Sequence, residues 1–291
     1  MPQVAHVIRA GSLPIDSWIE GAIKQYAKTS PSKVVSNVKM EVTVTPPIVY
    51  GLPFSQPVRA VVWLLLNKQH PFEFRMVNPG HPGKNGSRHP DFLEKNPGGT
   101  IPCLEEAESG FCLGEAHAIM TYLCKTRGWD DLYPSDNQTQ ARIDAYLHFH
   151  HRNVRDASML VAARVRKDLN FSEDMQAGSQ RSFLQAAEIL DSHYLKSSEF
   201  LFGDSVTIAD FAACVEVGQL GSDYTNILNL SQFPRLSRWL ERMKAVRGYA
   251  EVHYPLREIG DIRDEPPTID TLRAANVGGL DVLNKAVAQY S

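Results

Sequence analysis

The sequence predicts a two-domain protein in which a small α/β domain, built on a mixed sheet, is followed by an all-helical domain. Two observations support this prediction. Short apolar runs alternate with helical patterns up to about residue 127, and no strand pattern follows beyond that point. The chain also has 291 residues, which is enough for two domains of ordinary size.

The α/β domain is expected because its predicted elements are short and alternate in type. They are a strand at 48–50, a helix at 57–68, a strand at 72–77, a helical turn at 91–95, a strand pair at 100–104 and 110–113, and a helix at 115–125. The order βαβ–α–ββα is typical of a small α/β domain with a mixed sheet. The loop NPGHPGKNGSRHP, after the second strand, is rich in Gly and Pro and long for a compact domain.

The segment GWDDLYPSD is predicted to link the domains, and the rest of the chain is expected to be helical. Apolar spacing indicates two helices, marked by Ile143, Leu147, His150 and Val154 on a long one that begins near Asn137, and by Phe183, Ala187, Leu190 and Tyr194 on the next. A capping box is predicted at Thr207 and Asp210, where each side chain bonds the backbone N–H of the other residue. A further helix is expected after Pro234.

The predicted organisation includes an extension at each end. It comprises an N-terminal extension (1–45), the α/β domain (46–127), a linker (128–137), the all-helical domain (138–255) and a C-terminal tail (256–291). No apolar core typical of a secretory signal follows the start of the chain. Apolar residues between Ile15 and Tyr26 recur at helical spacing, so we expect an interaction arm there in preference to a cleaved address.

Composition argues against several classes of function. A net charge of -3 gives no general case for binding nucleic acid or an anionic membrane, and the longest apolar run, 61–66, is too short to span a bilayer. The four cysteines lack CxxC spacing, so we expect buried, reduced thiols and neither a disulfide framework nor a zinc site. The run HFHH, residues 148–151, invites a metal interpretation, but no partner ligand is evident and no metal site is predicted.

Five segments, in this order, resemble the soluble glutathione transferases of the theta class: FSQPVRA, NPGGTIPCLEE, LGEAHAIMTYL, LYPSD with QARIDAYL, and SVTIADF. The resemblance covers roughly Ile48 to Gly248. It implies a thioredoxin-like N-terminal domain with a mixed four-stranded sheet, an all-α C-terminal domain, and glutathione as co-substrate. It further implies a homodimer.

The resemblance places Ser55 opposite the thiol of bound glutathione. A thiol with a pKa near ~8.5 is mostly protonated at pH 7, although the thiolate is the nucleophile. A helix N-terminus offers unpaired N–H groups and partial positive charge, and a hydroxyl there can donate a further hydrogen bond to sulfur. Ser55 is therefore expected to stabilise the thiolate, the alternative being that it only caps the helix. Arg59, one turn later, is expected to be solvated or to face the linker.

The glutathione site is expected to involve four further positions, with a fifth contact from His89. By resemblance, the backbone of Ile101 pairs with the peptide, Pro102 is cis, and Glu115 takes the γ-glutamyl amino group. Ala116 departs from the family pattern, which has Ser or Thr there. A hydrogen bond to a charged group is worth ~1.5–3 kcal/mol, so the missing hydroxyl lowers the expected affinity by about one to two decades.

Arg155 and His151 are expected beside the electrophile. Arg155 falls where theta-class enzymes place an arginine near the substrate cleft, and His148 and His151 lie on the same predicted helical stripe. The predicted reaction is attack of the glutathione thiolate on a small electrophile or a peroxide. We expect a cytoplasmic protein, with mitochondria or another organelle as the alternative.

Two other functions remain open at this point. Ala116 and the two extensions also fit a non-catalytic module that serves as an interaction subunit of a larger assembly. Disulfide exchange, as in omega-type relatives, is disfavoured because position 55 is a serine and no CxxC precedes the first helix.

Overall fold

The computed structural model of the chain describes residues 45–166 and 168–290. The apolar residues between Ile15 and Tyr26, predicted to form an interaction arm, lie outside this range. The elements of the first domain are β1 (Ile48–Gly51), α2 (Gln56–Asn67), β2 (Glu73–Met76), α3 (Pro90–Lys95), β3 (Cys103–Glu106), β4 (Phe111–Gly114) and α4 (Ala116–Arg127). The predicted order of strands and helices in this domain is confirmed.

The four strands form one mixed sheet in the order β2-β1-β3-β4. β1 runs parallel to β2, with Val49 opposite Phe74, and antiparallel to β3, with Val49 opposite Leu104. β3 and β4 form an antiparallel pair. This is the mixed four-stranded sheet of a thioredoxin-like domain.

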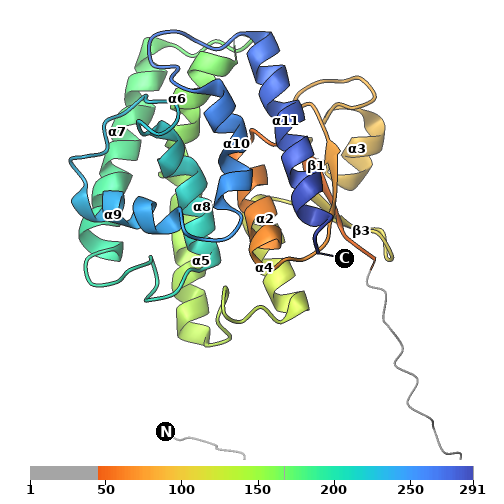
Figure 1. Ribbon diagram of the computed structural model, residues 1–291, viewed down its shortest axis with the longest axis horizontal. Coiled ribbons are helices and arrows are strands. Elements are labelled where there is room, and N and C mark those ends of the chain that lie inside the picture. Colours follow the sequence, from red (N-terminus) through yellow and green to blue (C-terminus); the bar gives the residue numbers. More distant parts are fainter. Residues whose placement is uncertain (1–44, 167, 291) are drawn as a thin grey trace, which may run out of the picture. The chain divides into compact units, whose positions relative to one another are not determined.

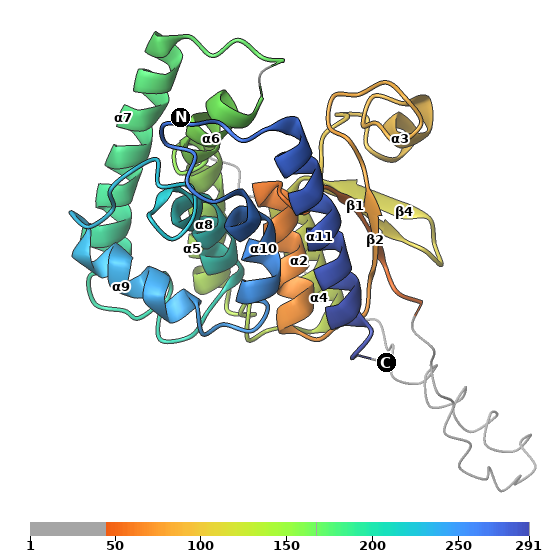
Figure 2. The same cartoon turned by 45° about the horizontal axis from the view of Figure 1, so that its top comes forward.

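The two faces of the sheet are covered by different helices, because side chains alternate along each strand. Val49 and Leu104 belong to the core formed with α2 and α4. Ile48, Tyr50 and Cys103 point to the other face, where Phe92 of α3 packs on them. Figure 2 shows α3 set apart from α2 and α4.

The second domain is helical throughout. Its elements are α5 (Asn137–Arg152), α6 (Asp156–Val165), α7 (Glu173–Ile189), the π-helical turn η1 (Leu190–Tyr194), α8 (Ile208–Val217), the 3₁₀ turn η2 (Gly218–Leu220), α9 (Pro234–Met243), α10 (Tyr249–Ile259) and α11 (Ile269–Val287). Among residues 45–290, leaving out 167, no helix is both long and apolar enough to cross a membrane.

Helix α8 is the centre of this domain, since each of its residues is buried. Its N-terminus carries the predicted capping box, in which the carboxylate of Asp210 accepts the backbone N–H of Thr207 at 2.9 Å. Asp210 also accepts the indole N–H of Trp239 and the backbone N–H of Leu201, both at 2.9 Å. One buried carboxylate thus joins α8, α9 and the segment before α8.

The C-terminal residues are more closely integrated than an appended tail. The boundary expected after residue 255 falls inside α10, and most of the expected tail forms the helix α11. In Figures 1 and 2, α11 lies beside α10, and it buries Ala275 and Leu283. A side chain at Gly279 would bring its Cβ to 2.8 Å from Pro53, in the loop between β1 and α2.

The expectation that Arg59 is solvated is wrong. Helix α2 packs against α8, so the face that carries Arg59 is interior, and the side chain is only 1% exposed. Its guanidinium donates to the carbonyl of Val215 at 3.0 Å and to the amide oxygen of Gln219 at 3.2 Å. Burial lowers the pKa of Arg59 to about 10, so the group still carries its charge at neutral pH.

The four cysteines are free thiols, and Cys103, Cys124 and Cys214 are buried, as expected, whereas Cys112 is only partly buried, so the expectation of burial is wrong for that residue. Burial raises the pKa of Cys103 and of Cys124 to about 12. These thiols are therefore protonated at neutral pH and suit a place in the core.

Candidate active site

Ser55 is the residue that precedes the first turn of α2. Its backbone is extended (φ -66°, ψ 127°), and Pro57 occupies the first turn, where a missing N–H removes no helical hydrogen bond. Its side chain makes no capping hydrogen bond, and within the described residues its hydroxyl has no partner. The simple capping role is therefore not seen. Ser55 therefore leaves its hydroxyl available to a ligand at the end of the helix where the backbone N–H groups are unpaired.

A cavity of about 150 Å³ lies next to this helix N-terminus. It is lined by Pro57, Thr100, Ile101, Pro102, Glu115, Ala116, His117, His151 and Arg155. All but Pro57, Thr100 and His117 are residues that the sequence predicted for the site. Ser55 itself does not line the cavity, but Pro57, two residues later in the first turn of α2, does.

The peptide between Ile101 and Pro102 is cis, as the resemblance implies. Ile101 lies two residues before β3, so its backbone is outside the ladder that pairs β3 with β1 and β4. A backbone segment in this position can pair with an extended peptide that enters the cavity.

Glu115 and Ala116 form the entrance to α4. Glu115 has a left-handed backbone (φ 66°, ψ 110°), which strains a residue other than glycine by roughly 1–3 kcal/mol. Such strain clusters at functional sites, because the surrounding structure must enforce it. Ala116 is the first residue of α4, and it lines the same cavity as Pro57 in the first turn of α2, so the N-termini of both helices border one cavity. Two helix N-termini side by side favour a ligand with two negative groups.

Arg155 reaches the cavity from a break between two helices. One helix was expected to run through Val154, but α5 ends at Arg152, so that expectation is wrong. The side-chain amide of Asn153 donates to the carbonyl of Phe149 at 2.9 Å and competes with the helical backbone. Arg155 then precedes α6, with its guanidinium 3.3 Å from the buried carboxylate of Glu216.

The histidines near the cavity form a cluster that sequence reasoning only partly identified. His117 was missed, although it directly follows the Glu115-Ala116 pair, and its ring centroid lies 5.0 Å from that of His150 and 6.4 Å from that of His151. Burial, together with the nearby charges of His151 and Arg155, lowers the pKa of His117 to about 4. His117 is therefore neutral at physiological pH. In the part of the chain that the structure describes, no group of three His, Cys, Asp or Glu residues could hold a metal ion.

His89 is not among the residues that line this cavity. It caps α3 instead, where its ring nitrogen Nδ1 accepts the backbone N–H of Asp91 at 3.3 Å.

A second cavity, of about 420 Å³, adjoins the residue before Ser55. Its walls include Phe54, the 78–82 loop, Val165 and Leu272. Asn276 of α11 accepts the backbone N–H of Phe54 through its side-chain oxygen, at 3.0 Å. The C-terminal helix therefore takes part in shaping the surroundings of Ser55.

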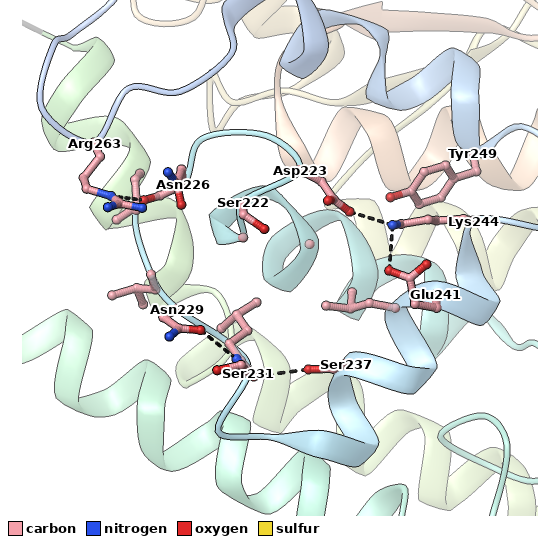
Figure 3. A pocket seen from close by; sticks show the side chains of 16 residues that line it. Ser222, Asp223, Asn226, Asn229, Ser231, Ser237, Glu241, Lys244, Tyr249 and Arg263 are labelled. Carbon is pink, nitrogen blue, oxygen red and sulfur yellow. Dashed lines mark hydrogen bonds and ion pairs between the residues drawn. The ribbon is translucent and has the colours of Figure 1, made fainter.

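A larger cavity, of about 630 Å³, lies elsewhere in the helical domain and contains none of the predicted site residues. Figure 3 shows the ammonium of Lys244 in ion pairs with two carboxylates, 2.6 Å from Asp223 and 2.7 Å from Glu241. The guanidinium of Arg263 donates to the carbonyl of Asn226 at 2.7 Å. The cavity beside Pro102 is smaller, but six of the predicted site residues line it, together with Pro57 from the first turn of α2 and Ala116 from the first turn of α4. We therefore take it as the candidate active site.

The fold and this site together define the class of protein: a thioredoxin-like domain with a cis-proline, joined to a helical domain whose α8 carries the capping box. Comparison with known proteins agrees. The family description "Glutathione S-transferase, N-terminal domain" matches residues 49–130, and "Glutathione S-transferase, C-terminal domain" matches residues 157–246.

Individual relatives narrow the assignment. Glutathione S-transferase D7 of Anopheles gambiae is 32% identical over 216 residues, covering 71% of this chain and 91% of the relative. Glutathione S-transferase theta-2B of Homo sapiens is 32% identical over 208 residues, covering 67% and 79%. Theta-3 of Mus musculus is 28% identical over 225 residues, covering 74% and 89%. The chain belongs to the glutathione S-transferase family and has theta-class members among its relatives.

Solved structures show the same architecture. Human glutathione-S-transferase T1-1 in its apo form has a TM-score of 0.62 at 24% identity, covering 81% of this chain and 99% of that one. A glutathione transferase of Bombyx mori, BmGSTD1, also has a TM-score of 0.62 at 24% identity. At these identities, the likeness shows the shared fold.

Proposed function

We propose that this protein is a glutathione transferase in which Ser55 stabilises the thiolate of bound glutathione. The observation that carries the proposal is that Ser55 directly precedes α2 with a hydroxyl that has no partner in the described residues, while Pro57 in the first turn of the same helix lines the cavity. Hydrogen bonding and the helix dipole both favour the charged form of the sulfur and lower its pKa. The thiolate then forms a bond to the electrophilic atom, and the leaving group departs with the electron pair.

Glutathione would lie across the cavity with its two ends at different elements. The backbone of Ile101, before the cis Pro102, would pair with the cysteinyl unit. The carboxylate of Glu115 would take the γ-glutamyl amino group. The backbone N–H of Ala116, with the dipole of α4, would hold the γ-glutamyl carboxylate. A contact between His89 and glutathione remains a prediction. His89 does not line the cavity, and its ring caps α3.

Arg155 and His151 would stand on the electrophile side. Both line the cavity, and Arg155 is 38% exposed, so its charge can reach a ligand. The separate cavity near Phe54 and Leu272 would offer apolar side chains to the electrophile. We propose no particular electrophile beyond a small molecule or a peroxide.

The proposal is tested by the pH dependence of turnover in the Ser55→Ala variant. Loss of the hydroxyl should lower kcat/KM and move the rising limb of the pH–rate profile to higher pH, because the bound thiol then deprotonates less readily. A variant that retains full activity with an unchanged profile would show that Ser55 has another role.

Ala116 favours a second candidate function, a non-catalytic interaction subunit. Its methyl group cannot donate the hydrogen bond that the family hydroxyl supplies, and it is buried in the cavity wall. Chromatography on immobilised glutathione separates the candidates. Retention, release by free glutathione and turnover support the enzyme. Co-purification with one partner at constant stoichiometry, without retention or turnover, supports the interaction subunit.

Homodimerisation and a cytoplasmic location are further proposals that rest on the family. Light scattering on the purified chain tests the first, with a mass of about twice the 32.5 kDa of one chain expected. Fractionation of cells that express the full chain tests the second, with mitochondria or another organelle as the competing location.

A further inference from the structure

A buried polar pair lies behind the candidate active site, on the element that runs from α8 into η2. It consists of Glu216 and Gln219, which are 1% and 0% exposed. The side-chain amide of Gln219 donates to the carboxylate of Glu216 at 3.2 Å. We call these two residues the Glu216–Gln219 pair.

One side of the pair holds the start of α6. The hydroxyl of Ser158 donates to Glu216 at 2.6 Å, and the guanidinium of Arg155 lies 3.3 Å from the other carboxylate oxygen. Glu216 lies on α8, whose residues are all buried, so its carboxylate has a fixed position. Arg155 is partly exposed, and its ion pair with this fixed carboxylate restricts the orientation of its guanidinium.

The other side of the pair holds the start of α2. The amide oxygen of Gln219 accepts from the side chain of Gln56 at 2.8 Å and from the guanidinium of Arg59 at 3.2 Å. Gln56 directly follows Ser55, and Arg59 lies in the next turn of the same helix. Two nitrogens of Arg59, Nε and Nη1, are buried without a hydrogen-bond partner. The nearby carboxylate of Glu216 offsets the charge of Arg59 at longer range.

We infer that the Glu216–Gln219 pair positions Arg155 and Ser55 relative to each other. Neither member lines the cavity, so both are positioning residues. The inference rests on the proposed function, since it assumes that Arg155 and Ser55 act on one bound thiolate and its electrophile. Side chains that are already fixed by hydrogen bonds to buried residues lose less conformational entropy when the substrates bind and react.

A double-mutant cycle distinguishes positioning through Arg155 from a general structural role. Glu216→Gln keeps the shape of the side chain but removes its charge. We expect Glu216→Gln to lower kcat/KM by about 10- to 100-fold in the native chain. In a chain that already carries Arg155→Met, the same substitution should lower kcat/KM by less than about twofold. An equal loss in both backgrounds would overturn the inference for Arg155.

A matched control is available in the same domain. Asp191 is a buried carboxylate, and its distance to the guanidinium of the partly exposed Arg235 is also 3.3 Å. Asp191→Asn should lower the midpoint of thermal unfolding without changing kcat/KM by more than about twofold, because this pair is remote from the cavity. An equal loss of kcat/KM in both variants would show that any broken buried ion pair has the same effect, and would overturn the inference.

A second variant at position 216 and a comparison with Ser55→Ala complete the test. If Glu216→Gln fails to fold, Glu216→Asp retains the charge near Arg59 but withdraws the carboxylate from Arg155, and the same non-additivity is expected. If Ser55→Ala lowers turnover but both Glu216 variants leave it unchanged, this inference is wrong while the proposed function stands. A native chain without turnover overturns the proposed function and, with it, the inference.

Discussion

Replacing Gly279 by alanine tests whether α11 holds the loop before Ser55 in place. The new Cβ would lie 2.8 Å from Cβ of Pro53 and 2.9 Å from Cγ of Pro255. Proline rings have no rotamer through which to yield, so the helix must shift. Alanine gains about 0.5–1 kcal/mol over glycine inside a helix, whereas overpacking costs about 1–3 kcal/mol. The middle of these ranges gives an expected net loss of about 1 kcal/mol in the free energy of unfolding.

The assay is denaturant unfolding together with steady-state turnover, and Gly178→Ala is the control. Gly178 lies in α7, where the closest atom to an added Cβ is a flexible guanidinium nitrogen at 4.0 Å. That variant should be stabilised by about 0.5–1 kcal/mol. Gly279→Ala should lose stability and about tenfold in kcat/KM. If both variants are stabilised alike and remain fully active, α11 does not restrain the Ser55 loop.

Three more predictions follow from single contacts. Ala116→Ser should tighten glutathione binding by about 10- to 100-fold, measured by calorimetry, because it supplies a hydrogen bond to a charged group; unchanged affinity would contradict the proposed pose. Asp210→Ala should lower the free energy of unfolding by more than about 3 kcal/mol in denaturant titrations, because it removes the bonds to Thr207, Leu201 and Trp239. In the folded chain the pKa of His117 is about 4, below its ordinary 6.5. Between these pH values the unfolded state binds more protons than the folded state, so the free energy of unfolding should fall as the pH is lowered from 6.5 to 4. His117→Gln should make that slope shallower, and an unaltered slope would contradict the assignment.

Local signals explain why much of the fold could be predicted. The alternation of strand and helix up to residue 127 depends on short-range periodicity, and the capping box at Thr207 and Asp210 depends on two residues three positions apart. The group of residues around Pro102 was predicted from the resemblance to a known family, which could be recognised because each motif was contiguous in the sequence.

What could not be predicted depends on contacts between distant segments. The burial of Arg59 follows from the packing of α2 on α8, more than 150 positions away. The role of α11 near Ser55 rests on a hydrogen bond between residues that are 222 positions apart. The break after Arg152 depends on one asparagine side chain that competes with the helix, and the apolar spacing around it gave no sign of this.

The absorbance of the glutathione thiolate, followed across pH in the native chain and in Ser55→Ala, shows whether the Ser55 hydroxyl lowers the pKa of the bound thiol. We expect the bound thiol of the native chain to have a pKa below the ~8.5 of a free thiol, and the variant to lose this shift while still binding glutathione. Ionisation at the same pH in both proteins, with glutathione bound to each, would contradict the claim that the Ser55 hydroxyl stabilises the thiolate.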